Sequence, residues 1–212
     1  MITDGLNPFT VLLFAGTVLS VVGLALIYLI ARLLKNQSIA RIASRVLLGG
    51  TGLYLLVLLV ASFTSRSRVL APGEEKHICE IDCHLAYSVA SARAESLGGG
   101  LVREVVTVKV RFDERTISAR RPRDATLTPN SRYVALVDDA GNQYPGSTDS
   151  LRRPLVPGES YTTTIPFEVP LKASGLRLIL RNDDPETHVI IGHENSLLHR
   201  KTVFALAGAS SS

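Results

Sequence analysis

Two cysteines and a histidine stand close together near residue 80: Cys79, Cys83 and His84, with three residues between the cysteines. Thiolate and imidazole are soft ligands of the kind that select copper. One reading of this segment is therefore an extracytoplasmic copper site, with His193 available as a distal ligand. An axial thioether is excluded, because Met1 is the only methionine in the sequence.

The same cysteines also have purely structural readings, as two buried thiols or as a disulfide between Cys79 and Cys83. On a regular strand their Cα atoms would be about 13 Å apart, well beyond the limit of about 7 Å for a disulfide. A disulfide or a shared metal therefore needs a turn through residues 80–82, whereas a strand would point Cys83 to the core and His84 outward. Thiol exchange is a third reading, but no predicted helix N-terminus lowers a thiolate pKa here. We favour structural cysteines over metal binding or redox exchange.

No motif of a known catalytic class accompanies these residues. The sequence has no Gly-x-Ser-x-Gly elbow, and Gly158-Glu159-Ser160 is typical of a turn that enters a strand. His193 is followed by Glu194 but not by a second histidine four residues on, as a zinc protease helix requires. We therefore expect no catalytic residues, no enzymatic activity and no cofactor, with copper as the alternative.

Two long apolar segments dominate the N-terminal part of the chain. Residues 8–31 contain no Asp, Glu, Lys, Arg or His, and at 1.5 Å per residue a helix of this length crosses a hydrocarbon core of about 30 Å. A second apolar segment covers residues 46–63. Lipid offers no partner to free backbone groups, so both segments are predicted transmembrane helices, about 8–31 and 44–63, within a hairpin spanning 1–65. A cleavable signal peptide is less favoured, because no Lys or Arg precedes the first segment.

The distribution of basic residues predicts the orientation of this hairpin. Four basic residues, Arg32, Lys35, Arg41 and Arg45, fall in the short polar stretch around the predicted loop 32–43, whereas the N-terminal tail carries only Asp4. Basic loops stay on the cytoplasmic side. We therefore expect a multi-pass protein of the inner (plasma) membrane, with the N-terminus and the C-terminal domain both extracytoplasmic.

Charge and small residues narrow the set of partners. Outside the N-terminal tail and the loop region up to residue 45, the chain has 19 basic and 18 acidic residues, taken from totals of 23 and 19. A nucleic-acid binder needs a basic surplus to release counterions, so a nucleic-acid partner is excluded.

Gly16 and Ser20 have the small-xxx-small spacing that lets transmembrane helices pack closely. The expected partners are the lipid bilayer and either an envelope protein or a second copy of this chain.

The sequence after residue 65 changes from apolar segments to short alternating ones. After a linker at 66–75, residues 103–112 alternate polar and apolar side chains with Val106, Val108 and Val110 on one face. Further strands are expected at about 133–138, 161–169, 176–181, 188–191 and 202–206. Turn-forming sequences separate them, at 98–100, 139–142, 156–159 and 182–185. This pattern favours a sandwich of two antiparallel sheets across residues 76–207, with a barrel as the alternative, followed by a flexible tail at 208–212.

Within this region, the segments VTVKVRF, VDDAGNQY, LVPGESYTTTIPFEVP and LRLIL follow one another between Val105 and Arg181. This run resembles the immunoglobulin-like domains of unknown function found on bacterial lipoproteins and membrane-anchored surface proteins. The resemblance covers about a third of the chain and implies a β-sandwich with no assigned catalytic residues. The segments around Cys79–Cys83 and His193 lie outside it, so any particular function is expected there.

The expected fold class is membrane-anchored all-β, with two N-terminal transmembrane α-helices followed by an immunoglobulin-like antiparallel β-sandwich. The expected function is that of a bacterial cell-envelope interaction or assembly module. The alternative is an extracytoplasmic copper-binding or thiol-redox protein that uses Cys79, Cys83 and His84.

Overall fold

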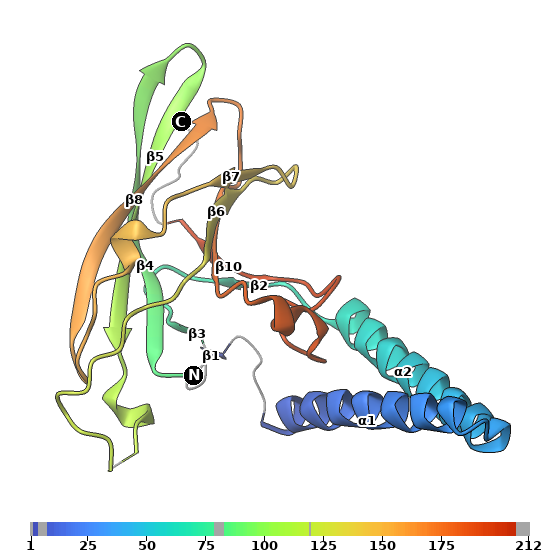
Figure 1. Ribbon diagram of the computed structural model, residues 1–212. Coiled ribbons are helices and arrows are strands. Elements are labelled where there is room, and N and C mark those ends of the chain that lie inside the picture. The colour runs from blue at the N-terminus through green and yellow to red at the C-terminus, as the bar shows by residue number, and fades with distance from the viewer. Residues whose placement is uncertain (1, 4–7, 79–82, 119, 207–212) are drawn as a thin grey trace. The chain divides into compact units, whose positions relative to one another are not determined.

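The computed structural model describes residues 2–3, 8–78, 83–118 and 120–206 (Figure 1). The chain forms two compact units, which we call the sandwich unit and the helical unit. The sandwich unit contains Met1–Asp4, Ser67–Asp184 and Lys201–Ser212, and the helical unit contains Gly5–Arg66 and Pro185–Arg200.

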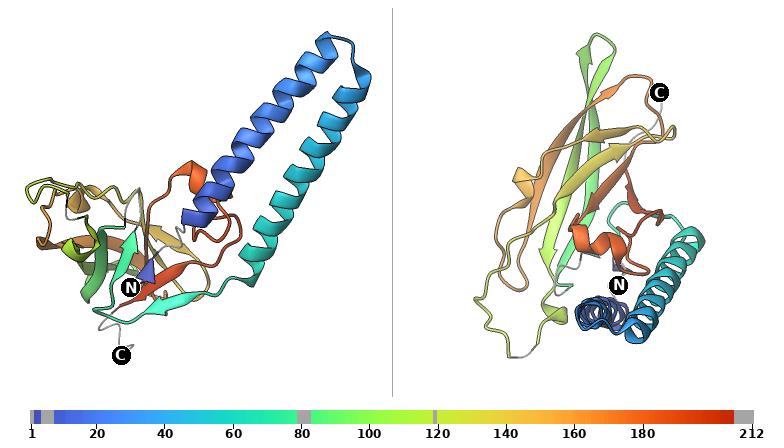
Figure 2. Two further views of the ribbon diagram at one scale, coloured as in Figure 1. Left: turned by 90° about the horizontal axis from the view of Figure 1, so that it is seen from below. Right: turned by 45° about the vertical axis from the view of Figure 1, so that its right-hand side comes forward.

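Two long antiparallel helices, α1 (Pro8–Leu33) and α2 (Gln37–Thr64), form most of the helical unit (Figure 2). Only a tight turn joins them, in which Lys35 has a φ of 56° and the Asn36 side chain accepts a hydrogen bond from Ile39 N at 3.2 Å. Helix α2 thus begins at Gln37 rather than at about residue 44, and the predicted loop 32–43 is largely helical. Lys and Arg are good helix formers, so basic residues of the predicted loop, such as Arg41, can form part of a helix.

Both helices are long and apolar enough to cross a membrane by length and composition. The large apolar side chains on them are mostly exposed, including Leu19 at 73% and Leu48 at 74%. A helix that is apolar on all sides differs from the amphipathic helix of a soluble domain, which hides one apolar stripe.

The remaining part of the helical unit is a segment near the C-terminus, Pro185–Arg200, which contains the 3₁₀-helix η3 (Pro185–Val189). The Tyr54 hydroxyl donates a hydrogen bond to Val189 O at 2.7 Å, and Arg200 N donates to Ser65 Oγ at 2.8 Å. These two hydrogen bonds attach the segment to α2 and to the residue that follows this helix. The strand predicted at 188–191 is wrong, because residues up to Val189 form η3 and the following residues form turns.

Two five-stranded sheets make up the sandwich unit (Figure 1). The first sheet has the order β1-β3-β4-β5-β8 and the second has the order β2-β10-β9-β6-β7. The strands of the first sheet are β1 (Ile2–Thr3), β3 (Lys76–Ile78), β4 (Leu85–Gly98), β5 (Leu101–Phe112) and β8 (Ser160–Pro170). Those of the second are β2 (Arg68–Leu70), β10 (Thr202–Ala205), β9 (Arg177–Arg181), β6 (Tyr133–Val137) and β7 (Gln143–Pro145).

The core lies between these sheets. Val106, Val108 and Val110 of β5 alternate with polar residues and are at most 1% exposed, as the period of two in the sequence predicts. Leu178 of β9 packs in the same apolar cluster. A polar bond also links the sheets, because the fully buried Lys76 of β3 donates from Nζ to Leu180 O at 3.0 Å.

The prediction of a β-sandwich after two apolar helices is confirmed, but the chain as a whole is not all-β. Most strand pairs are antiparallel, whereas β1 pairs with β3 and β2 pairs with β10 in parallel. The predicted linker 66–75 includes β2, which pairs with the C-terminal strand β10. Residues 185–200 belong to the helical unit, so the predicted domain 76–207 differs from the sandwich unit at this insertion.

The longest feature of the sandwich unit is the β4–β5 hairpin, whose tip extends past the second sheet in Figures 1 and 2. Gly98, Gly99 and Gly100 make its turn with φ values of 76°, 62° and 79°, a conformation that L side chains rarely adopt. We call Leu85–Val89 the proximal half of β4 and Ala90–Gly98 its distal half. The proximal half is buried throughout, whereas the distal half is exposed except at the half-buried Ala92.

Candidate functional site

A buried carboxylate, Asp113, lies immediately after β5 and caps the 3₁₀-helix η1 (Glu114–Thr116). Its side chain is 4% exposed. Asp113 Oδ1 accepts hydrogen bonds from Arg115 N at 3.2 Å and from Arg115 Nε at 3.0 Å, and Oδ2 accepts from Arg115 Nη2 at 3.1 Å. An aspartate at this position satisfies a backbone N–H that the start of a helix leaves free.

A second arginine, Arg111, connects Asp113 to the segment before β3. Arg111 Nε and Nη2 donate to the two carboxylate oxygens of Glu75 at 2.8 and 2.5 Å, and Nη2 also donates to Asp113 Oδ2 at 3.2 Å. A fork of two parallel bonds is the strong, orientation-specific form of an arginine–carboxylate pair. It therefore ties the start of β3 to the end of β5 across the intervening strand β4.

The third partner of Asp113 is His77 of β3. His77 is 3% exposed, and its Nε2 lies 3.3 Å from Asp113 Oδ2. In the neutral imidazole this geometry makes Nε2 the donor, which leaves Nδ1 as an acceptor. Nδ1 is buried, and no described residue forms a hydrogen bond with it.

These contacts set the charge of the cluster. Hydrogen bonds from Arg115, and then from Arg111 and His77, hold the pKa of the Asp113 carboxyl well below its usual range, against the opposing effect of burial. The hydrogen bond from Arg111 likewise lowers the pKa of Glu75, and Glu75 followed by Asp113 raises the pKa of Arg111 above its usual range. Both carboxylates and both arginines are therefore charged at neutral pH, and Asp113 is too weak a base to accept a proton in catalysis.

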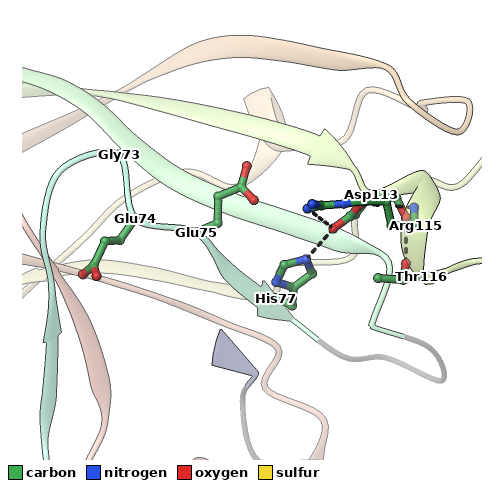
Figure 3. Close-up of a pocket in the computed structure, with 7 residues that line it drawn as sticks. All are labelled: Gly73, Glu74, Glu75, His77, Asp113, Arg115 and Thr116. Atoms are coloured by element: carbon green, nitrogen blue, oxygen red, sulfur yellow. Dashed lines mark hydrogen bonds and ion pairs between the residues drawn. The ribbon is translucent and has the colours of Figure 1, made fainter. Parts of the chain in front are cut away.

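A cavity of about 680 Å³ borders this cluster (Figure 3). His77, Asp113, Arg115 and Thr116 gather at one end of it, and Gly73 and Glu74 lie at the other. Asp113 and Glu75 already accept from charged donors, so they contribute fixed charge instead of reactivity. The arrangement is that of a structural tie between strand ends, which borders the cavity.

The structure places the residues singled out in the sequence as follows. Cys79 lies outside the described residues, while Cys83 is disulfide-bonded. The sequence has one other cysteine, so the disulfide prediction stays a prediction for the pair. Among the described residues, no three His, Cys, Asp or Glu side chains group as a metal site requires.

His84 is not outward-facing as strand parity predicted. It precedes β4 instead of lying in a strand, is 7% exposed and stacks on Phe112 with ring centroids 5.7 Å apart. Its Nδ1 lies 2.6 Å from Thr116 Oγ1, and this hydroxyl also donates to Asp113 O at 2.7 Å. These contacts attach His84 to the Asp113 cluster.

His193, the proposed distal ligand, belongs to the helical unit. It is fully buried, and its Nδ1 accepts a hydrogen bond from Asn195 N at 3.0 Å. The Asn195 side chain donates in turn to Thr187 Oγ1 at 3.1 Å. Among the described contacts, His193 thus orders the backbone of its own segment.

Comparisons with known proteins identify no family for this chain. No family model and no curated protein matches it. Two solved structures are similar at 12% sequence identity. One is the secreted protein MPT63 from Mycobacterium tuberculosis, with a TM-score of 0.43, covering 67% of this chain and 99% of that protein. The other is an uncharacterised β-sandwich protein from Clostridium difficile 630, with a TM-score of 0.39, covering 66% and 95%.

Sequence reasoning missed Glu75, Arg111, Asp113 and Arg115 as a group. A signal for part of it was present, because an aspartate that directly follows an alternating strand is a typical N-cap. The other members, Glu75 and His77, carry no such signal. They lie at β3, a separate strand whose position beside β5 depends on the sheet register.

Proposed function

We propose that this chain is a multi-pass inner (plasma) membrane protein whose immunoglobulin-like β-sandwich acts outside the cytoplasm as a non-enzymatic interaction or assembly module of the cell envelope. The observation that carries the interaction role is the distal half of β4, which leaves the body of the sandwich and is exposed. The two apolar helices are its tether.

The tether rests on the length and exposure of the helices. Helix α1 has 26 residues and α2 has 28, so each is about 40 Å long at 1.5 Å per residue and exceeds the hydrocarbon core. Arg32, Lys35 and Arg41 lie at the end where the helices join. By the positive-inside rule this end is cytoplasmic, which puts the chain on either side of the hairpin outside.

Exposed leucines at the hairpin tip support a role in binding. Leu97, Leu101 and Leu171 are 40%, 43% and 71% exposed. They lie at adjacent strand ends, because Gly98 pairs with Leu101, Leu101 pairs with Pro170, and Leu171 N donates to Gly100 O at 2.8 Å. Grouped apolar side chains on a surface mark interaction sites more often than scattered ones do.

The disulfide at Cys83 favours structural cysteines over the copper alternative. A sulfur in a disulfide has no thiolate to give to a metal, and thiolate is the form that binds metals. Disulfides also persist in oxidising compartments such as the periplasm, which agrees with an extracytoplasmic sandwich.

Membrane topology provides the first test. Leu171→Cys and Asn36→Cys would each be combined with Cys79→Ser and Cys83→Ser, and intact cells with a permeabilised outer envelope would be treated with a membrane-impermeant maleimide. In intact cells we expect labelling at residue 171 and not at residue 36. Residue 36 is expected to be labelled only after the membrane is dissolved. Labelling at residue 36 alone in intact cells would overturn the proposed orientation.

In-cell photo-cross-linking tests the interaction role. A photoreactive amino acid at Leu101 is expected to give adducts of discrete mass. The same group at the exposed Arg152 is the matched control, since it lies away from the hairpin in sequence. Equal, diffuse cross-linking at both positions would contradict a binding role for the hairpin tip.

A further inference from the structure

One edge of the first sheet is open over most of the length of β4. On one side, β5 pairs with β4 from Leu85 to Gly98. On the other side, β3 pairs only with Leu85–Tyr87, and Gly73 N donates to Val89 O at 2.9 Å. Within the described part of the chain, no strand pairs with the distal half on this side. Its outward N–H and C=O groups therefore form a template for a further strand.

The other sheet edges among the described strands are protected in recognised ways. The edge strands β1, β2 and β7 have two or three residues, and β8 carries Pro166 and Pro170. Short strands and prolines are the usual devices against edge-to-edge pairing. The distal half of β4 has no proline, and its side chains between Ala90 and Ser96 are Ala or Ser apart from Arg93 and Glu95.

From this edge we infer that a second copy of this chain pairs with the distal half of β4 in antiparallel register, with the two-fold axis at Ala94. The inference rests on the proposed function and names its partner. The register β4–β5 is regular between the irregularities at Val89/Ser91 and Ser96/Gly98, so residues Ala92–Ser96 form an unbroken strand. A symmetric pair places Ala94 opposite Ala94 and, one step out on each side, Arg93 opposite Glu95 of the second copy.

Charge complementarity selects this occupant and this register. Arg93 and Glu95 form an exposed ion pair within one strand, with Nε and Oε1 3.1 Å apart and side chains 70% and 45% exposed. Glu95 is also opposite Arg103 of β5, and Arg103 Nη2 lies 3.5 Å from Glu168 Oε1 of β8. In the symmetric pair Glu95 lies between Arg103 and Arg93 of the second copy, which extends this alternation of charge across both sheets.

Cross-linking tests the register. The full-length chain carrying Ala94→Cys, purified in detergent micelles, would be treated with a short bis-maleimide, and Thr162→Cys on the exposed part of β8 is the matched control. We expect a covalent dimer from the residue 94 variant and monomer from the residue 162 variant. Equal yields from both would overturn the proposed pairing.

Charge exchange tests the partner. Arg93→Glu makes both edge charges negative and Glu95→Arg makes both positive, so each variant alone faces like charges across the two-fold axis. We expect each to dimerise about tenfold more weakly than the natural chain, and a 1:1 mixture of the two to regain its affinity, measured by sedimentation in detergent. Lys109→Glu on the same face controls for the charge change.

The outcome also separates this inference from the proposed function. Failure of the mixture to associate more tightly than either variant alone would overturn self-pairing. If that protein still resides in the membrane and still gives discrete adducts from residue 101 to other proteins, the interaction role stands and only the identity of the partner is wrong. Loss of both would overturn the proposed function as well.

Discussion

The two halves of β4 lie beside the same strand, β5, yet they meet different surroundings. The proximal half faces the second sheet and has β3 on its free side, and the Asp113 cluster and the disulfide at Cys83 lie at its end. Among the described strands, the distal half has one neighbour, β5, and its side chains are exposed except at Ala92. Burial and ion pairing are thus concentrated at the proximal half. The distal half can therefore bind a partner without a large cost in stability.

Matched leucine substitutions at the two ends of β4 test this contrast most strongly. Leu85 is 2% exposed and Leu97 is 40% exposed. Leu85→Ala is expected to lower the free energy of unfolding by about 3 kcal/mol, because it empties a buried volume, whereas Leu97→Ala is expected to change it by less than about 0.5 kcal/mol. Denaturant unfolding of the full chain in micelles, followed by tyrosine fluorescence, measures both. Equal effects would mean that the distal half is packed as tightly as the proximal half.

The second comparison is between a buried and an exposed carboxylate. Asp113→Ala leaves Arg111 and His77 without their shared partner and is expected to cost about 3 kcal/mol in unfolding free energy. Asp139→Ala is the control, because Asp139 pairs with Arg177 at 3.0 Å while its side chain is 61% exposed, and such pairs are worth about 0.5 kcal/mol. A loss below about 1 kcal/mol for the Asp113 variant would show that the cluster does not hold the strand ends.

These two regions also show how far the sequence alone predicts the structure. The alternation at Val106, Val108 and Val110 and the glycine turn at 98–100 determine the β4–β5 hairpin locally. The pairs Glu75–Arg111 and His77–Asp113 each join residues 36 apart in sequence, and they depend on a register that no local pattern contains. The attachment of Pro185–Arg200 to α2 is unpredictable for the same reason, since its bonds to Tyr54 and Ser65 are long-range.

The disulfide at Cys83 gives a third way to sharpen the contrast, because it lies next to the proximal half. Alkylation of the purified, unreduced protein is expected to modify no thiol, and reduction is expected to expose two. Cys83→Ser is expected to lower the free energy of unfolding by about 2 kcal/mol, the value for closure of a loop as small as that between Cys79 and Cys83. A free thiol count of two before reduction would contradict the structural disulfide and return the metal and redox readings to consideration.

The smallest effect per unit of change is expected on adding acid. Because its partners lower the pKa of Asp113 in the folded chain, its contribution to stability is fully present above the unfolded pKa of about 3.9 and is lost as the pH falls below it. Between about pH 4 and pH 2 the natural chain is expected to lose on average about 1 kcal/mol per pH unit more than Asp113→Asn, which has no proton to bind there. Parallel unfolding curves for both proteins across this range give the difference in slope. Identical slopes would mean that Asp113 already titrates in the folded state as it does in the unfolded chain, and that the arginines beside it are not its partners in solution. The ion pair of the distal half, Arg93–Glu95, is exposed, so Glu95→Gln is expected to leave the acid slope of the natural chain unchanged. That result would assign the acid sensitivity to the cluster beside the proximal half.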